Sequence, residues 1–136
     1  ELVVSPRHPL AERNHTSIYS LADIPMIMLT PETAGRRFLD QILSRYKIEP
    51  RIVMVLSSSE EVKRMVELNL GAAVISKMSI ANEVRAGTLK MIKVNELEIP
   101  RPVGVVYKAG RYLNTALQQF LNDLKGMPET QFLGSE

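Results

Sequence analysis

The chain has 136 residues, of which 45% are hydrophobic and 24% charged, with a formal net charge of +2. This composition predicts one globular domain with a sizeable core. Lys and Arg are scattered and aromatic residues make up only 5%, so a nucleic-acid-binding face is not expected. The absence of cysteine excludes disulfides and thiolate metal sites, and no apolar run has membrane-spanning length.

The first third of the chain reads as two strands separated by turns, followed by a helix. The expected strands are residues 2–4 and 24–29, with a proline-rich turn, a polar loop (residues 12–17) and one helical turn (residues 20–23) between them. Thr30 or Thr33 is suited to cap the next helix. The buried stripe of that helix is predicted to contain Phe38, Leu39, Ile42, Leu43 and Tyr46.

Residues 52–76 have the pattern of a strand, a turn, a helix and a second strand. Residues 52–56 are an unbroken apolar run, as expected of a strand covered on both faces. Ser57 and Ser58 each have a glutamate three residues later, Glu60 and Glu61, so either can open a capping box. The second buried strand is expected at residues 72–75. A strand, a helix and a strand in this order form a βαβ unit, which predicts a parallel sheet.

The helix inside this unit is expected to end at Gly71 and to be amphipathic. Its predicted apolar stripe is Val62, Met65, Val66 and Leu70, and its predicted solvent-facing residues are Glu60, Lys63, Arg64 and Glu67.

The remainder of the chain is predicted to contain one short helix, two strands and a final helix. The expected elements are a short helix at residues 77–84, a half-exposed strand at 89–94, a strand at 103–107, an amphipathic helix at 113–124 that Gly126 ends, and a loose tail at 127–136. The fold class is therefore α/β, with a mostly parallel sheet flanked by helices.

No set of residues suggests an enzyme. The sequence contains no P-loop, no G-x-S-x-G and no G-x-G-x-x-G motif. Neither His8 nor His15 has acidic residues at metal-ligand spacing, and His8 is better explained as part of a proline-rich turn. We therefore expect no catalytic residues, no metal and no cofactor.

Two strand-to-helix turns are candidates for binding an anion. Backbone N–H groups at a helix N-terminus carry a partial positive charge and lack intrahelical acceptors. The candidate residues are Thr33, Ala34 and Gly35 in one turn, Ser57 and Ser58 in the other, and Arg36 or Arg37 as partners for a carboxylate. The alternative is that these serines and threonines are ordinary helix caps.

The order of several motifs resembles the effector-binding domain of LysR-type transcriptional regulators, whose fold is similar to type 2 periplasmic binding proteins. Each motif is weak alone, and together they span about residues 1–125. The motifs are Leu2–Ala11 with its His-Pro-Leu turn, Leu21–Ile27, Gly35-Arg36 with Phe38–Asp40, Ser59–Val62 leading to Met65-Val66 and Leu70–Ile75, Gly87–Leu89 and Val103–Tyr107. Asn69 is a departure, because the family usually has glycine there. Asparagine tolerates left-handed backbone geometry, so the turn is expected to survive.

The resemblance implies one lobe of a two-lobe domain in which crossing strands join the lobes and a cleft holds the effector. By this analogy residues 1–6 are the first hinge strand and residues 7–102 the second lobe. Residues 103–126 are the returning hinge strand and a helix of the missing first lobe, and residues 127–136 are a tail. The chain is then expected to be part of a longer protein.

The function that the resemblance implies is sensing of a small anionic or carboxylate effector by a cytoplasmic bacterial regulator. DNA binding would then belong to a helix-turn-helix domain absent from this sequence, and no membrane partner is expected. The apolar stripe of the final helix favours a homo-oligomer. The competing interpretation is a lobe of a periplasmic-type solute-binding receptor, which a secretion signal on the parent gene would favour.

Overall fold

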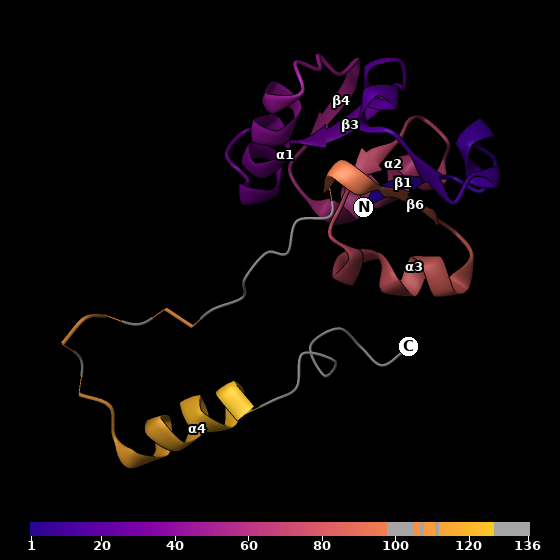
Figure 1. Ribbon diagram of the computed structural model, residues 1–136. Helices are drawn as coiled ribbons and strands as arrows, with labels where there is room; N and C mark the ends of the chain where they lie inside the picture. The colour runs from indigo at the N-terminus through magenta and orange to yellow at the C-terminus, as the bar shows by residue number, and fades with distance from the viewer. Residues whose placement is uncertain (98–104, 107, 111, 127–136) are drawn as a thin grey trace. The chain divides into compact units, whose positions relative to one another are not determined.

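The computed structural model describes residues 1–97, 105–106, 108–110 and 112–126 (Figure 1). The chain divides into two compact units, Glu1–Ile99 and Pro100–Glu136. In the second unit, helix α4 spans Thr115–Gly126. The side-chain oxygen Oδ1 of Asn114 accepts a hydrogen bond of 2.9 Å from the Leu117 N–H at the start of this helix. The predicted tail lies outside the described residues, as do residues 103, 104 and 107 of the predicted strand.

Six strands form the sheet within the described residues of the first unit. Their bounds are β1 Leu2–Val4, β2 His15–Thr16, β3 Met26–Leu29, β4 Ile52–Leu56, β5 Ala73–Val74 and β6 Lys90–Val94. The order is β2-β6-β1-β5 in one part and β3-β4 in the other, and a parallel bridge between Met26 and Ala72 joins the two parts. The predicted α/β class is confirmed, but the sheet is mixed, because β1 lies between β5 and β6 and runs antiparallel to both.

In the described part of the first unit, three α-helices and several 3-10 turns connect these strands. The α-helices are α1 Ala34–Arg45, α2 Ser59–Glu67 and α3 Ala81–Ala86. The 3-10 turns are η1 Pro9–Glu12, η2 Ile18–Ala22, η3 Lys77–Ile80 and η4 Asn95–Leu97. Helix α1 connects β3 to its neighbour β4, whereas α2 leads from β4 back across β3 to β5 (Figure 1).

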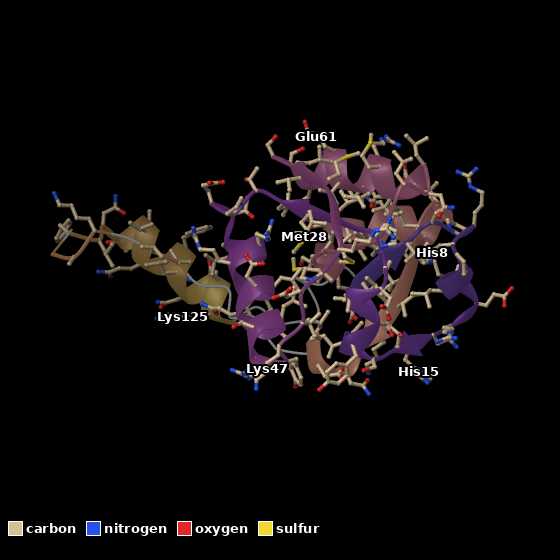
Figure 2. All side chains as sticks on the ribbon, turned by 90° about the horizontal axis from the view of Figure 1, so that it is seen from above. His8, His15, Met28, Lys47, Glu61 and Lys125 are labelled. Carbon is tan, nitrogen blue, oxygen red and sulfur yellow. The ribbon has the colours of Figure 1, made fainter. Side chains whose placement is uncertain are left out.

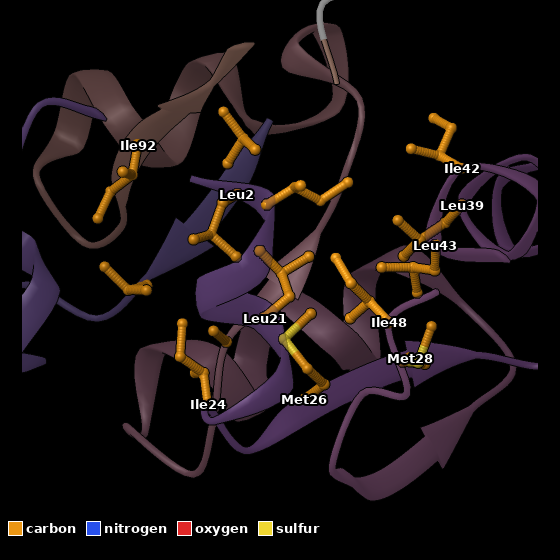
Figure 3. Close-up of a cluster of buried hydrophobic side chains, with 14 residues drawn as sticks. Leu2, Leu21, Ile24, Met26, Met28, Leu39, Ile42, Leu43, Ile48 and Ile92 are labelled. Atoms are coloured by element: carbon orange, nitrogen blue, oxygen red, sulfur yellow. The ribbon is translucent and has the colours of Figure 1, made fainter. Parts of the chain in front are cut away.

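The core has two parts, one on each face of the sheet. Because side chains alternate along a strand, Leu2 and Val4 of β1 contribute to one cluster while Val3 contributes to the other. The first cluster contains the buried face of α1, with Leu39, Ile42 and Leu43 packed near Met26 and Met28 (Figure 3). The second contains Val62 and Val66 of α2. The sheet is therefore covered by helices on both faces.

The prediction that residues 52–56 form a strand covered on both faces is wrong. Strand β4 pairs with β3 alone among the described residues, and Ile52, Val53 and Val55 are 41%, 45% and 48% exposed. The physical reason is the strand order: β3, not β4, lies next to β5, so β4 is at the edge of the sheet. A continuous apolar run predicted the strand itself correctly but not its position in the sheet.

Helix α2 ends earlier than predicted, because Asn69 and not Gly71 provides its left-handed terminus. Asn69 has φ 61°, and the Leu70 N–H donates back to Met65 O at 3.1 Å, as in a Schellman motif. Leu70 is consequently half exposed and outside the helical stripe. The expected tolerance of Asn69 for this geometry is confirmed.

Gly71 has a different role, which is to allow two strands to approach. A Cβ atom at this position would lie 2.7 Å from Pro25 O and 3.1 Å from the Ile27 side chain. The backbone of the neighbouring Ala72 makes two hydrogen bonds of 2.8 Å: its carbonyl accepts from the Ile27 N–H, and its N–H donates to Pro25 O. Any side chain at residue 71 would push the chain away from β3 and break these bonds.

We predict that Gly71→Ala lowers the free energy of unfolding by about 1–3 kcal/mol, the usual cost of overpacking. Gly35→Ala is the matched control, because its Cβ would meet Leu29 at an ordinary 3.8 Å and alanine favours a helix. Urea unfolding of both variants measures the difference. Equal stability of the two variants would show that the close approach at Gly71 is not a constraint.

Candidate functional site

The structure brings the two predicted turns to the same edge of the sheet. Strands β3 and β4 are parallel, with Leu29 opposite Leu56 at their carboxyl ends. The Thr30 N–H donates to Leu56 O at 2.9 Å, so the turn to α1 and the turn to α2 begin as neighbours. In parallel sheets of this kind, ligands bind outside the carboxyl ends of the strands.

The turn before α1 is capped by Thr33, not Thr30. Thr33 Oγ1 accepts from the Arg36 N–H at 3.3 Å and donates to Thr30 O at 2.9 Å. Helix geometry gives the N–H groups of Ala34 and Gly35 no intrahelical acceptor. This turn therefore presents backbone donors that the threonine side chain does not use.

The two candidate arginines are both held by the chain itself. Arg36 donates through Nε to both carboxylate oxygens of Asp40, at 2.8 and 3.0 Å, and through Nη1 to Leu29 O at 2.9 Å. Its side chain is only 13% exposed. Arg37 is exposed and donates through Nη1 to Glu32 O at 2.8 Å. Arg36 is thus a fixed guanidinium beside the α1 turn, with part of its charge balanced by Asp40.

The turn before α2 is a capping box formed by Ser58 and Glu61. Ser58 Oγ accepts from the Glu61 N–H at 3.2 Å, and Glu61 Oε2 accepts from the Ser58 N–H at 3.1 Å. The same Glu61 oxygen also accepts from the N–H of Ser57 at 3.2 Å and from its hydroxyl at 3.0 Å. Of the two alternatives that the sequence left open, Ser58 is the cap.

Glu61 therefore occupies the donors that an anionic ligand would use at this turn. The hydrogen bond from the Ser57 hydroxyl, followed by that from the Ser58 backbone, lowers the pKa of Glu61, so the carboxylate is charged at neutral pH. Glu61 lies at the surface of the first unit, where it meets solvent (Figure 2). The sequence suggested a capping box but gave no sign that one carboxylate oxygen would accept from both serines.

His8 is part of a turn, as the sequence suggested. Its Nδ1 accepts from the Leu10 N–H at 3.1 Å and so begins η1 (Figure 2). Burial lowers the pKa of His8, which keeps the ring neutral and Nδ1 able to accept. Within the described part of the chain, no group of three His, Asp or Glu side chains is arranged to hold a metal ion.

The sequence did not predict the burial of Lys63, which was expected to face water. Its side chain is 7% exposed, and Nζ lies 2.7 Å from Glu60, 2.7 Å from Glu83 and 3.1 Å from Ser79 O. Burial alone would lower the pKa of Lys63, but the hydrogen bonds to Glu60 and Glu83 outweigh it and raise that pKa. The ammonium ion thus fastens α2 to η3 and α3, contacts between distant residues that helical periodicity cannot reveal.

A sheet with helices on both faces is an α/β architecture, and here two helix N-termini lie at the same edge of that sheet. Comparison with known families identifies it further, because the model of the LysR substrate binding domain matches residues 2–127. The chain therefore belongs to the LysR substrate-binding domain family, and the resemblance found in the sequence is confirmed. This is a family of transcriptional regulators and not of enzymes.

Curated relatives and solved structures agree with this assignment. The chain is 29% identical over 127 residues to a probable RuBisCO transcriptional regulator of Phaeodactylum tricornutum, and 29% identical over 126 residues to one of Trichormus variabilis. These alignments cover 91% and 90% of the chain, but only 41% and 37% of the relatives. The chain thus spans about two fifths of the length of these regulators.

Two solved regulatory domains share the fold. The Synechocystis CcmR regulatory domain in complex with 2-PG has a TM-score of 0.78 at 25% identity, covering 93% of this chain and 63% of that one. The effector binding domain of QuiR in complex with shikimate has a TM-score of 0.77 at 21% identity, and the match covers 91% of this chain and 60% of that one.

Among the residues that the structure describes, no helix is long and apolar enough to cross a membrane.

The Lys63 network gives a pH-dependent prediction. Lys63→Met should lower the free energy of unfolding at pH 7 by roughly 2 kcal/mol, less than for a fully buried pair because Glu60 is exposed to water. The hydrogen bond from Lys63 lowers the pKa of Glu83 in the folded protein. The stabilisation is therefore fully present above the ordinary pKa of glutamate. It is lost as the pH falls through the lower pKa that Glu83 has in the folded state. Because the pKa of Lys63 is raised, the ammonium group stays charged and the stabilisation persists at neutral pH.

The measurement is urea unfolding of the wild type and Lys63→Met at pH 7 and at about pH 3. Arg64→Met is the control, because Arg64 pairs with Glu67 at 2.8 Å on the same helix but is 76% exposed, so its removal should cost less than about 1 kcal/mol. A Lys63→Met effect no larger than that of Arg64→Met would contradict a stabilising role for the buried ammonium.

Proposed function

We propose that the chain is the effector-sensing part of a LysR-type DNA-binding transcriptional regulator and binds a small anionic metabolite. The observation that carries this proposal is the meeting of two helix N-terminal turns at the carboxyl ends of β3 and β4, in a chain of this family. The proposed contacts are Thr33, Ala34 and Gly35 in one turn and Ser57 and Ser58 in the other. Arg36 is the favoured charged partner, because Asp40 and Leu29 O hold it beside the first turn.

The proposed site is one side of a cleft between two lobes. Residues 1–6 would be the first hinge strand, residues 7–102 the second lobe, and residues 103–126 the returning strand with a helix of the first lobe. The described first unit, Glu1–Ile99, supports this division. The solved domains that share the fold are longer than this chain, so the opposite side of the cleft would lie mostly outside these 136 residues. We therefore expect weak binding by this chain alone.

The chemical class of the effector follows from the donors. Backbone N–H groups, hydroxyls and a guanidinium all favour an anion with carboxylate or phosphate oxygens. The CcmR regulatory domain, which shares 25% identity with this chain, was solved with the anion 2-PG. In the proposed regulator, binding would shift the lobes relative to each other and so change how the DNA-binding domain is held.

Three further features complete the proposal. DNA would be contacted through a helix-turn-helix domain outside this sequence, the regulator would act in the cytoplasm, and copies of the chain would associate. Helix α4 supports association, because Leu117, Leu121 and Leu124 lie on one face with Phe120, which is half exposed, beside them. Light scattering at different protein concentrations measures this association.

Titration of backbone amide NMR shifts tests the proposed site. We expect 2-phosphoglycolate to move the amides of residues 33–37 and 57–59 together, because both turns would contact one ligand. Sulfate and acetate, added separately, show whether a phosphate-like group or a carboxylate is preferred. Movement of neither turn with any of the three anions at millimolar concentration would contradict anion binding by this chain and favour ordinary helix caps.

Glu61 gives a second prediction for the same site. Since its carboxylate holds the donors of Ser57 and Ser58, Glu61→Gln should increase the affinity for 2-phosphoglycolate several-fold at this turn. Glu60→Gln is the matched control, because it removes the same charge from the same helical turn but from a residue that pairs with Lys63. Equal effects of the two variants would mean that only the net charge matters and that Glu61 does not compete with the ligand.

A further inference from the structure

Two glutamates lie in the first turn of α2, and the fold holds their charges in different ways. Glu61 accepts from Ser57 and Ser58, at the proposed site itself. Glu60 is directed elsewhere: its carboxylate lies 2.7 Å from Lys63 Nζ, and its side chain is 77% exposed. A carboxylate in the first turn of a helix offsets the partial positive charge of the helix N-terminus. The position of Glu60 therefore matters for an anion that binds at this turn.

The ammonium group of Lys63 is fixed by the segment that follows β5. Nζ lies 2.7 Å from Glu83 of α3 and donates to Ser79 O of η3 at 3.1 Å, and the lysine side chain is only 7% exposed. Burial would lower the pKa of Lys63, but the hydrogen bonds to Glu60 and Glu83 raise it, so the group stays charged. A fixed cation therefore determines where the exposed carboxylate of Glu60 lies.

We propose that Lys63 is a positioning residue for the anion site. It holds the Glu60 carboxylate on the side of α2 that faces η3 and α3 and balances its charge, so that the turn before α2 keeps its attraction for an anionic effector. This inference rests on the proposed function, because it concerns the same turn. Lys63 would act through Glu60 and would not touch the effector, since its ammonium group is buried among oxygens of the chain.

The size of the effect depends on screening by salt. At about 0.01 M salt the Debye length is about 30 Å, so a carboxylate in the first turn of α2 acts on a ligand bound there. At about 1 M salt the Debye length is about 3 Å, and the same charge is screened. Because 2-phosphoglycolate carries more than one negative charge, a misplaced Glu60 carboxylate should weaken its binding about threefold or more at low salt. The effect should disappear at high salt.

Glu60→Asp moves the charge and leaves the buried part of the network in place. Aspartate is one methylene shorter, so its carboxylate is too short to keep the 2.7 Å contact with Lys63 and stays near the turn, while the bond between Lys63 and Glu83 remains. We expect Glu60→Asp to weaken binding of 2-phosphoglycolate about threefold or more at low salt, and Glu60→Gln to leave it within about twofold. The amide NMR titration of residues 57–59 measures both affinities.

Lys63→Met tests the same inference from the side of the cation and should also weaken binding at low salt. Two double variants of equal net charge identify the cause. Adding Glu60→Gln to Lys63→Met should restore the affinity, because it removes the carboxylate from the turn. Adding Glu83→Gln should not restore it, because Glu60 keeps its charge and has lost its partner. Thermal unfolding shows that each variant is folded, and a purely structural role of Lys63 would persist at about 1 M salt.

A measurement without effector separates this inference from the proposed function. Carboxyl 13C NMR follows the titration of Glu61, and Glu60→Asp should raise the pKa of Glu61, because a second carboxylate then lies near it, whereas Glu60→Gln should not. This result in a protein that binds no 2-phosphoglycolate would contradict the proposed function and still support the role of Lys63. An unchanged pKa of Glu61 in Glu60→Asp would overturn that role, and so would equal restoration of the affinity by Glu60→Gln and Glu83→Gln.

Discussion

The arrangement of this domain depends on the pairing of β3 with neighbours on both sides. On one side it is parallel to β4, and on the other the Ala72 backbone exchanges two 2.8 Å hydrogen bonds with Pro25 and Ile27. The second contact exists only because residue 71 is glycine. Since β3 lies between β4 and β5, the chain must cross one face of the sheet through α1 and return across the other through α2, and both helices start from the same edge.

The two turns at that edge are alike in backbone geometry but different in electrostatics. At α1 the N-cap is the neutral Thr33, and the Arg36 guanidinium, paired with Asp40, is held beside it by Leu29 O. At α2 the chain provides its own anion, Glu61, which accepts three hydrogen bonds through one oxygen. An entering anion would thus find the first turn open and the second occupied. The first turn should contribute more to the initial attraction, and the second should contribute only after Glu61 has moved away.

Local signals in the sequence were sufficient for the elements and the turns, and insufficient for the strand order. Ser58 with Glu61, and Thr33 with Arg36, act through neighbours within three residues, so their roles were visible as capping patterns. The end of α2 was predicted at Gly71 instead of Asn69, because glycine and asparagine can both end a helix. The position of β4 was not, because the continuous apolar run of residues 52–56 is the same whether the strand is central or at the edge of the sheet. Lys63 was misjudged for a similar reason: beside its neighbour Glu60, its partners Glu83 and Ser79 O are twenty and sixteen residues away, and only the fold brings them to it.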